Sequence, residues 1–414
     1  RILIDGKPSG LAGINIADAL KMLPADAVDK VEVITNPSAR YDAEGGAGIV
    51  NIILKKGKAQ GINGSVMAVA GNPDNFGGNT NMFGRMEGAA TGPATALNDS
   101  KSGQMKGIGL TMEGIEQNPV IYELFTSNTW HNQPLVLNEW LPKYVRNRYG
   151  ENNQKALEAW SILRNTIYTV PKDKYIRDGA ESIIQARPTL DSTAQWAKTK
   201  LNYEPKAILP AWKAMVAAAP KLKNSEGYQF DLVDLSRQVL ANYALVVQRK
   251  WVTAYRAKDQ AAFKKHSTQF IELIEDLDEL LGTHPDFLLG KWVSDARNCG
   301  ETNAEKDLYE RNAKNLITLW GDQNSPLHEY ACRQWNGLLN DFYKPRWQQF
   351  FALLGNDLQR KTNTDFKTFT KQVKEWEWQW VNTKKTYMAV PKGDPIKKAL
   401  ALFIKYNNTI TYSY

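Results

Sequence analysis

The second part of the chain is dominated by long stretches whose apolar residues recur at helical spacing. From about Pro134 to the C-terminus, apolar positions fall at i, i+3, i+4 and i+7, and short Pro- or Gly-containing breaks separate the stretches. Candidate helix caps are Ser225 with Glu226, and Thr283 ahead of Pro285. No exact repeat period stands out, so the pattern predicts a compact all-α domain and not a solenoid. The predicted helices are Ala156–Tyr168, Ser192–Tyr203, Pro210–Ala219, Leu232–Lys250, Gln260–Leu281, Ala304–Trp320, Leu327–Phe351 and Thr364–Asn382.

Residues 107–129 predict a strand that leads through a turn into a helix. Gly107–Met112 is a short apolar run of strand length, and Asn118 and Pro119 are suited to begin a helix that runs to Thr129. Glu113 stands where the strand ends, which is where alternating β/α folds place their chemistry. A carboxylate in that place can act as a nucleophile or a general base. A single glutamate is also typical of a turn at the surface, so the position alone leaves both interpretations open.

The composition is that of a globular protein. The chain has 414 residues, 43% of them hydrophobic, which suffices for two or three domains with proper cores. No apolar run approaches the ~18 residues that a membrane-spanning helix needs. The net charge is +8, but basic residues alternate with acidic ones along the sequence and form no basic stripe, which argues against nucleic-acid binding. A mildly basic helical face would suit acidic glycans, and a solvated helix surface explains the same charge.

Few other side chains suggest chemistry. Cys299 and Cys332 show no metal-ligand spacing and no evident His partner, so two free or packed thiols are expected. The four histidines are scattered, and we expect neither a metal nor a cofactor.

Residues 1–73 read differently from the rest. Ile2–Ile4, Val31–Ile34 and Ile49–Leu54 are strand-like, and Ile16–Leu23 is a helical stretch that stops at Pro24. The glycine-rich run at residues 45–48 lacks the Lys-Ser/Thr of a P-loop and the spacing of a dinucleotide fingerprint, which excludes it as a phosphate cradle. Arg1 stands in mid-strand without a signal-peptide pattern, so we expect the chain to be truncated at its N-terminus.

From about Asp74 onward the chain resembles the α-N-acetylglucosaminidases of glycoside hydrolase family 89. The resemblance consists of long strings in the family's order and covers most of the chain. The strings are Asn75-Phe-Gly-Gly78, Met82-Phe-Gly-Arg-Met86, Gly107–Asn118, Phe230-Asp-Leu-Val-Asp-Leu-Ser-Arg-Gln238, Leu289-Gly-Lys-Trp292, Tyr309-Glu-Arg-Asn312, Leu319-Trp-Gly321, Tyr330-Ala-Cys-Arg-Gln334 and Tyr343-Lys-Pro-Arg-Trp347.

The resemblance implies roles for particular residues. By position in the Met-Glu-Gly-Ile string, Glu113 inherits the role of catalytic nucleophile. The resemblance places Asn75, Phe76 and Gly77 at a barrel mouth beside the sugar, where a structural tight turn explains the string equally well. It also places Trp320 of the helical domain against the sugar, whose apolar C–H face suits a flat indole.

The acid/base partner of Glu113 is not found in the matched region. Retaining hydrolysis needs two carboxyl groups about 5–5.5 Å apart, and the family's acid/base glutamate lies in an earlier part of the barrel. Glu116 and Glu123 do not match that position and are expected to be a helix-start charge and a solvated or paired side chain. Three further family residues have spacings that fit ion pairing on a helix surface as well as function: Asp231, Asp234 and Arg237.

Residues 1–73 are similar to the plug domain of TonB-dependent outer-membrane receptors. The residues that carry this similarity are Leu3-Ile-Asp-Gly-Lys-Pro8, Leu23-Pro24, Val31-Glu-Val-Ile-Thr-Asn-Pro-Ser-Ala-Arg-Tyr-Asp42 and Gly45–Lys56. The large barrel of such a receptor does not follow, and near Gly71–Asp74 the sequence changes to the hydrolase family.

The expected fold is therefore mainly α, in three parts. Residues 1–73 form a small α+β plug-like fragment, residues 74–133 the last β/α units of an incomplete (β/α)₈ barrel, and residues 134–414 an all-α domain. Within the barrel part, residues 79–96 are expected to be helical.

The resulting expectation is a truncated, retaining α-N-acetylglucosaminidase that is weakly active or inactive as this chain. Its partner would be a glycan with terminal α-linked N-acetylglucosamine, without nucleic acid or a membrane span, and self-association is left open. The alternative is a non-catalytic glycan-binding or envelope interaction protein with a plug fragment. The plug resemblance implies the cell envelope, in the periplasm or at the outer membrane.

Overall fold

The computed structural model divides the chain into two compact units, Arg1–Ala68 and Val69–Tyr414. It describes residues 2–4, 7–8, 28–34, 49–54, 82, 84–110, 118–169, 182–191, 199–326 and 328–411. The two units are considered one at a time.

The described part of the first unit is a four-stranded mixed sheet. Its strands are β1 (Ile2–Ile4), β2 (Lys7–Pro8), β3 (Val28–Ile34) and β4 (Ile49–Leu54), in the order β2-β1-β4-β3. β1 and β4 are parallel, and the other two pairs are antiparallel. The three strands predicted from sequence are confirmed, although β3 begins earlier, with an irregularity between Val28 and Lys30. The helix predicted at Ile16–Leu23 lies outside the described residues.

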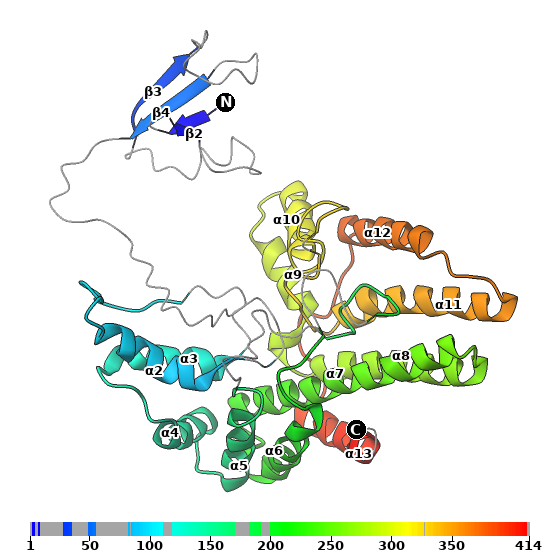
Figure 1. The fold of residues 1–414 in the computed structure, drawn as a ribbon, viewed down its shortest axis with the longest axis horizontal. Helices are drawn as coiled ribbons and strands as arrows, with labels where there is room; N and C mark the ends of the chain where they lie inside the picture. The colour runs from blue at the N-terminus through cyan, green and yellow to red at the C-terminus, as the bar shows by residue number, and fades with distance from the viewer. Residues whose placement is uncertain are drawn as a thin grey trace. The chain divides into compact units, whose positions relative to one another are not determined.

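In the described residues of the second unit every named element is a helix, which confirms the mainly α class (Figure 1). Its α-helices are α2 (Met86–Leu97), α3 (Pro119–Ser127), α4 (Leu137–Tyr149), α5 (Gln154–Arg164), α6 (Leu209–Leu222), α7 (Glu226–Arg256), α8 (Gln260–Leu281), α9 (Leu289–Asn298), α10 (Asn303–Leu316), α11 (Lys344–Arg360), α12 (Phe366–Asn382) and α13 (Pro395–Thr411). Short helical turns are η2 (Asn128–Trp130), η4 (Pro205–Ile208), η5 (Pro285–Phe287) and the π-helical η6 (Leu339–Tyr343). No helix among the described residues is long and apolar enough to cross a membrane.

The core of the second unit is built around α7, which is 31 residues long and buried on several faces. α8 packs along it, and α4, α6 and α13 contact it from other sides. Large aromatic side chains fill the space between these helices, and Trp251 of α7 touches Phe263, Phe270, Trp347 and Phe351 edge-on. A helix that is buried on so many sides is the structural centre of its domain.

The helical pattern predicted several helices closely. Gln260–Leu281 is α8 with the same bounds, and α5, α6, α10 and α12 overlap their predicted ranges. The prediction for Leu327–Phe351 is wrong in its first part, because residues 328–337 form turns and irregular backbone before η6. Residues 199–203 are irregular as well, where the end of a helix was predicted, and residues 192–198 are outside the described part.

One of the two predicted caps is confirmed. The Ser225 hydroxyl accepts a hydrogen bond from the backbone N–H of Tyr228 at the start of α7. The Thr283 hydroxyl instead donates to Leu280 O, and His284 caps η5 through the N–H of Asp286. The prediction for Thr283 is therefore wrong by one residue.

The segment before α3 is less regular than predicted. Residues 107–110 form no strand, because none of the described residues pairs with them. The helix predicted for residues 79–96 begins only at Met86, after two described residues, Gly84 and Arg85, that are not helical. Pro119 begins α3 as predicted, but the side chain of Asn118 makes no capping bond and instead accepts a hydrogen bond from the Tyr168 hydroxyl.

Candidate functional site

Most of the residues selected from sequence lie outside the described part of the chain. Glu113 and Glu116 are in the gap at residues 111–117, and Asn75, Phe76 and Gly77 are in the gap before Met82. Their proposed roles stay predictions. Glu123 is described, and it is exposed on α3 as expected for a solvated side chain. Trp320 is the one predicted binding residue whose surroundings are described.

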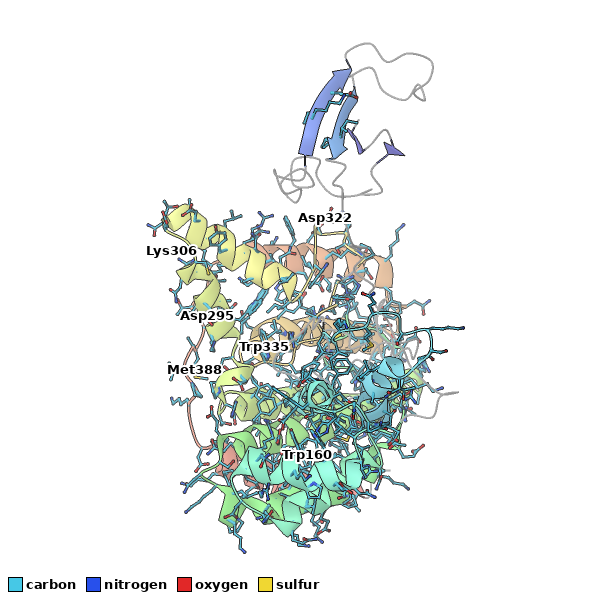
Figure 2. All side chains as sticks on the ribbon, turned by 90° about the vertical axis from the view of Figure 1, so that its left-hand side faces the viewer. Trp160, Asp295, Lys306, Asp322, Trp335 and Met388 are labelled. Carbon is cyan, nitrogen blue, oxygen red and sulfur yellow. The ribbon has the colours of Figure 1, made fainter. Side chains whose placement is uncertain are left out.

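Trp320 lies just after α10, on the connection of residues 317–338 that leads to η6, which we call the α10–η6 loop. Its backbone N–H donates to Asn315 O at 2.8 Å. The side-chain amide of Asn315 makes two hydrogen bonds to Gly321, the residue after Trp320: Nδ2 donates to Gly321 O at 2.6 Å, and Oδ1 accepts from Gly321 N at 2.9 Å. Figure 2 shows Asp322, which follows this turn, at one end of the helical unit, and Trp160 toward the other. The turn holds Trp320 at the surface, 36% exposed.

Tyr330 lies against Trp320, although ten residues separate them in the sequence. Their ring centroids are 4.9 Å apart, and the ring planes are tilted by 56°. Two aromatic faces at an angle offer an apolar corner, a shape that suits the C–H face of a sugar ring or a similar flat ligand. Tyr330 was not selected from sequence, although it begins one of the strings that carry the family resemblance.

The α10–η6 loop has an unusual backbone. Trp320, Glu329 and Cys332 all have positive φ, at 52°, 64° and 46°. Non-glycine residues rarely adopt this conformation, which costs roughly 1–3 kcal/mol each and persists only where the surroundings enforce it. Such positions cluster at binding and catalytic sites, so the backbone independently marks this loop as a candidate site.

A buried row of charges lies beneath the loop. Glu329 Oε1 is 2.5 Å from Arg346 Nη1, which is 2.7 Å from Glu377 Oε1, and Glu377 Oε2 is 2.6 Å from Arg187 Nη2. The Arg346 and Glu377 side chains are fully buried, and Arg346 Nη2 also donates to Gln185 O at 2.8 Å. We call these four residues the charge row. Because Glu329 precedes Tyr330 directly, the charge row fixes the backbone that carries the aromatic pair.

The charge row contains two carboxyl groups in different states. Burial raises the pKa of Glu329 to about 7, since the guanidinium of Arg346 offsets burial only in part and Glu377 adds repulsion. Burial would also raise the pKa of Glu377, but the two guanidinium groups of Arg346 and Arg187 outweigh it and lower the value. Glu377 is therefore the permanent anion of the row, and Glu329 is the member that titrates near neutral pH.

The other end of the loop is anchored by Asp278 of α8. Its carboxylate accepts hydrogen bonds from Gly337 N at 2.7 Å, Asn340 N at 3.1 Å and Asn336 Nδ2 at 2.8 Å. Burial raises the pKa of Asp278 to about 6, and the two backbone donors partly offset it. The loop is thus held by side chains at its start, its middle and its end, and the aromatic corner is preorganised.

Asp231 and Asp234 of α7 are buried, so the surface ion pairing that their spacing also fits is wrong. Asp231 accepts two hydrogen bonds from Arg148 of α4, at 2.6 and 2.9 Å, and a third from the Tyr149 hydroxyl at 2.7 Å. Asp234 pairs with Arg237 on the same helix at 2.7 Å, and both side chains are nearly inaccessible. The Asp231 contacts fasten α4 to α7, which is a structural role.

Other predicted features are simple to place. Both cysteines are thiols as predicted: Cys299 is exposed, and Cys332 is buried with its Sγ donating to Glu329 O at 3.0 Å. Within the described ranges no three His, Cys, Asp or Glu side chains come together as a metal site would require.

Fold and loop together define an all-α domain that presents an aromatic corner above a buried charge row. Residues 140–405 match the family described as the α-N-acetylglucosaminidase (NAGLU) C-terminal domain, and residues 69–132 match its tim-barrel domain. The chain belongs to the α-N-acetylglucosaminidase family.

Individual relatives agree with this assignment. The human protein named alpha-N-acetylglucosaminidase is 32% identical over 334 residues, which cover 80% of this chain and 44% of the human protein. A family 89 glycoside hydrolase from Clostridium perfringens, solved with PUGNAc, matches with a TM-score of 0.74 and 33% identity over 80% of this chain and 38% of that chain. A structure with 2-acetamido-1,2-dideoxynojirimycin matches equally well.

A third Clostridium perfringens structure carries two glutamates replaced by glutamine and holds its substrate, GlcNAc-α-1,4-galactose. It matches with a TM-score of 0.73 and 32% identity over 81% of this chain and 39% of that chain. This chain therefore spans less than half the length of the relatives that it matches.

Proposed function

We propose that this chain is the C-terminal part of a retaining α-N-acetylglucosaminidase, and that its α10–η6 loop forms one wall of the sugar site. The observation that carries the proposal is the Trp320–Tyr330 corner on a loop held in strained backbone within the family's own helical domain. The related Clostridium perfringens structures, which hold N-acetylglucosamine-like ligands, support the substrate class.

In this proposal Glu113 is the nucleophile. A retaining mechanism forms a glycosyl–enzyme ester on one carboxylate, while a second carboxyl group protonates the leaving oxygen and later activates water. The two glutamates replaced in the substrate-bound relative fit such a carboxylate pair. In this chain the matched region offers Glu113 alone, so we propose that it cleaves substrate weakly or not at all.

Hydrolysis of an aryl α-N-acetylglucosaminide tests this proposal. We expect turnover near the background rate, and Glu113→Gln should change it little. Rapid turnover that Glu113→Gln abolishes would confirm the nucleophile and overturn the expected inactivity. Rapid turnover that survives this substitution would show that the nucleophile is misassigned.

Ligand binding tests the aromatic corner separately from catalysis. Calorimetry with 2-acetamido-1,2-dideoxynojirimycin should show binding that Trp320→Ala weakens about tenfold, because a ring stacked on a sugar contributes roughly 1–1.5 kcal/mol. Trp130→Ala is the matched control, since Trp130 is 86% exposed and lies at η2. If both substitutions weaken binding equally, the α10–η6 loop is not part of the sugar site.

A second candidate is a non-catalytic glycan-binding protein. It is favoured because the described residues that form the corner and its support all lie within residues 185–377, in the helical domain. Glycan binding that is lost in a Trp320 variant, is unchanged in a Glu113 variant and occurs without turnover would favour this second candidate.

We further propose that α2 and α3 are the last helices of an incomplete (β/α)₈ barrel and that residues 1–73 derive from a TonB-dependent receptor plug. The mixed sheet of the first unit suits a small α+β segment, and the barrel-family match at residues 69–132 includes both helices. A plug fragment would place the protein in the cell envelope. Fractionation of cells that produce the chain tests this, and recovery in the cytosolic fraction alone would contradict it.

A further inference from the structure

Almost all of the net charge of this protein is located in two short segments that are distant in the sequence. Residues 249–265 and 357–371 together hold ten Lys or Arg against three Asp, a balance of +7. The other 382 residues hold 42 Lys or Arg against 41 Asp or Glu. The whole chain carries +8, so the remainder is close to neutral.

The fold brings these two segments together. The first spans the end of α7 and the start of α8, and the second spans the end of α11 and the start of α12. Gln260 Nε2 donates to Leu358 O at 3.1 Å, and the Tyr255 and Thr364 hydroxyls are 2.7 Å apart. The rings of Phe263 and Phe351 pack beneath them. We call the surface formed by residues 249–265 and 357–371 the basic end, and its helices meet on the right-hand side of Figure 1.

The basic charges of this surface face solvent. Nine of the ten are exposed: Arg249, Arg256, Lys258, Lys264, Lys265, Arg360, Lys361, Lys367 and Lys371. Among the described residues only Arg256 of these nine has an acidic partner, Asp191, at 4.0 Å and with both side chains largely exposed. A pair of that kind contributes little.

The three acidic residues within the basic end are engaged in local hydrogen bonds. Asp259 accepts from Ala262 N at 2.9 Å and caps α8, and Asp365 accepts from Thr368 N at 3.0 Å and caps α12. Asp357 accepts from the Thr362 hydroxyl at 2.7 Å. These carboxylates accept hydrogen bonds from groups at the helix ends. The surrounding cations therefore produce a positive electrostatic field over the four helix ends.

We propose that the basic end is a docking surface for an anionic polysaccharide, a chain of sugars that bear sulfate or carboxylate groups. Flexible lysines, which supply six of the nine exposed charges, suit scattered anionic groups on a polymer better than a single fixed phosphate. Complementarity of charge is the physical basis of the interaction, because the ten cations of this surface outnumber its three aspartates.

Two other polyanions fit the surface less well. Proteins hold single-stranded nucleic acid by stacking its bases on exposed aromatic rings. Among the described residues of the basic end, Phe366 is the one large apolar side chain that is exposed, at 40%. A membrane surface would need several such apolar anchors beside the lysines. The choice of a glycan among polyanions rests on the proposed function, but the anion-binding surface itself does not.

The basic end is remote from the aromatic corner. Lys367 and Glu377 both lie on α12, ten residues apart, and a helix rises by about 1.5 Å per residue, so about 15 Å separates them along its axis. The basic end can therefore hold one part of a polymer while the α10–η6 loop contacts another. Such two-point attachment raises the effective concentration of the chain end at the corner.

Binding of dextran sulfate to the whole chain tests the proposal, with uncharged dextran as the blank. The test variant replaces Lys264, Lys265, Lys367 and Lys371 by Gln. The control variant replaces four exposed lysines near α6 by Gln: Lys206, Lys213, Lys221 and Lys223. Both variants lose the same net charge, so a difference in their affinity for dextran sulfate shows that the position of the lysines matters and not the total charge.

We expect the unmodified chain to bind dextran sulfate and to lose about 10³-fold in affinity between 50 and 200 mM salt, as for a surface with six or more anion contacts. The test variant should bind about 100-fold more weakly at 50 mM salt and show a shallower salt dependence, while the control variant stays within about threefold. Equal losses in both variants, or no binding to dextran sulfate, would overturn the proposal.

The same series distinguishes the other polyanions and the proposed function. Tighter binding to single-stranded DNA, or to vesicles of anionic phospholipid, than to dextran sulfate would show that the partner class is wrong. The test variant should bind 2-acetamido-1,2-dideoxynojirimycin as the unmodified chain does. Loss of that binding only in the Trp320 variant, and of dextran sulfate binding only in the lysine variant, establishes the two surfaces independently.

Discussion

Substitution of Glu329 by Gln should change how the stability of the helical unit depends on pH. The pKa of this buried carboxyl is raised from 4.5 to about 7, with burial as the main cause. Between these two pH values the folded chain holds a proton that the unfolded chain has released, so its folding weakens as pH rises. One pKa unit corresponds to 1.36 kcal/mol, and the contribution lost across this window is therefore about 3 kcal/mol. Gln keeps an acceptor for Arg346 and cannot ionise.

A neighbouring group partly conceals this effect in the unmodified protein. Burial lowers the pKa of His328 from 6.5 to about 3. Between those values the unfolded chain binds a proton that the folded chain does not, so this contribution strengthens folding as pH rises. The contributions of these two groups oppose one another between about pH 4.5 and 6.5 and nearly cancel there. In the Glu329→Gln variant the His328 contribution is no longer offset by Glu329, so stability should depend on pH more positively than in the unmodified protein.

Urea unfolding followed by tryptophan fluorescence measures this, because all 13 tryptophans lie in the second unit. The free energy of unfolding of the variant, relative to the unmodified protein, should increase by about 3 kcal/mol from pH 4.5 to 7.5, since the His328 contribution cancels in the difference. Glu375→Gln, at an exposed position of α12, controls for loss of a carboxylate. A difference that does not vary with pH would refute the assignment of Glu329 as the titrating member of the charge row.

Three further substitutions test the packing of the helical unit, each by urea unfolding at pH 7. Asp231→Ala leaves the Arg148 guanidinium without its buried partner and should lower the free energy of unfolding by about 3–5 kcal/mol; a loss below 1 kcal/mol would show that this pair does not fasten α4 to α7. Gly290→Ala should destabilise by more than about 2 kcal/mol, because a Cβ there would lie 2.1 Å from Met388 O, and a neutral result would mean that the backbone at that residue moves freely. Thr302→Ala removes the capping box of α10 and should cost about 1 kcal/mol, whereas an effect near zero would indicate that packing alone sets the start of that helix.

Local sequence signals identified helices well where the apolar spacing is regular. α8 was predicted with its observed bounds, and Ser225 was correctly placed at the start of α7. These signals depend on neighbours within about four residues along the chain, which are the same in any fold. By contrast, residues 328–337 have apolar residues at helical spacing and still form turns and irregular backbone. Their path is set by Asp278, Thr318 and Arg346, which are distant in sequence.

The candidate site shows the same limit. Trp320 was selected through its family string, but only the fold places Tyr330 against it and Glu329 in a buried charge row. Nothing in the spacing of Asp231 distinguishes a surface ion pair from a buried one, because the spacing does not say which face of α7 is covered by α4.

The sequence by itself determined that this chain is mainly α-helical, that it belongs with the α-N-acetylglucosaminidases, and that its two cysteines are thiols. The tertiary structure decided which side chains meet: the aromatic corner, the charge row and the basic end each join residues from separate segments. Charge illustrates the reason most directly. The excess positive charge lies in two segments that are far apart in the sequence, and only the packing of α8 against α11 brings them onto one surface, where their electrostatic fields add.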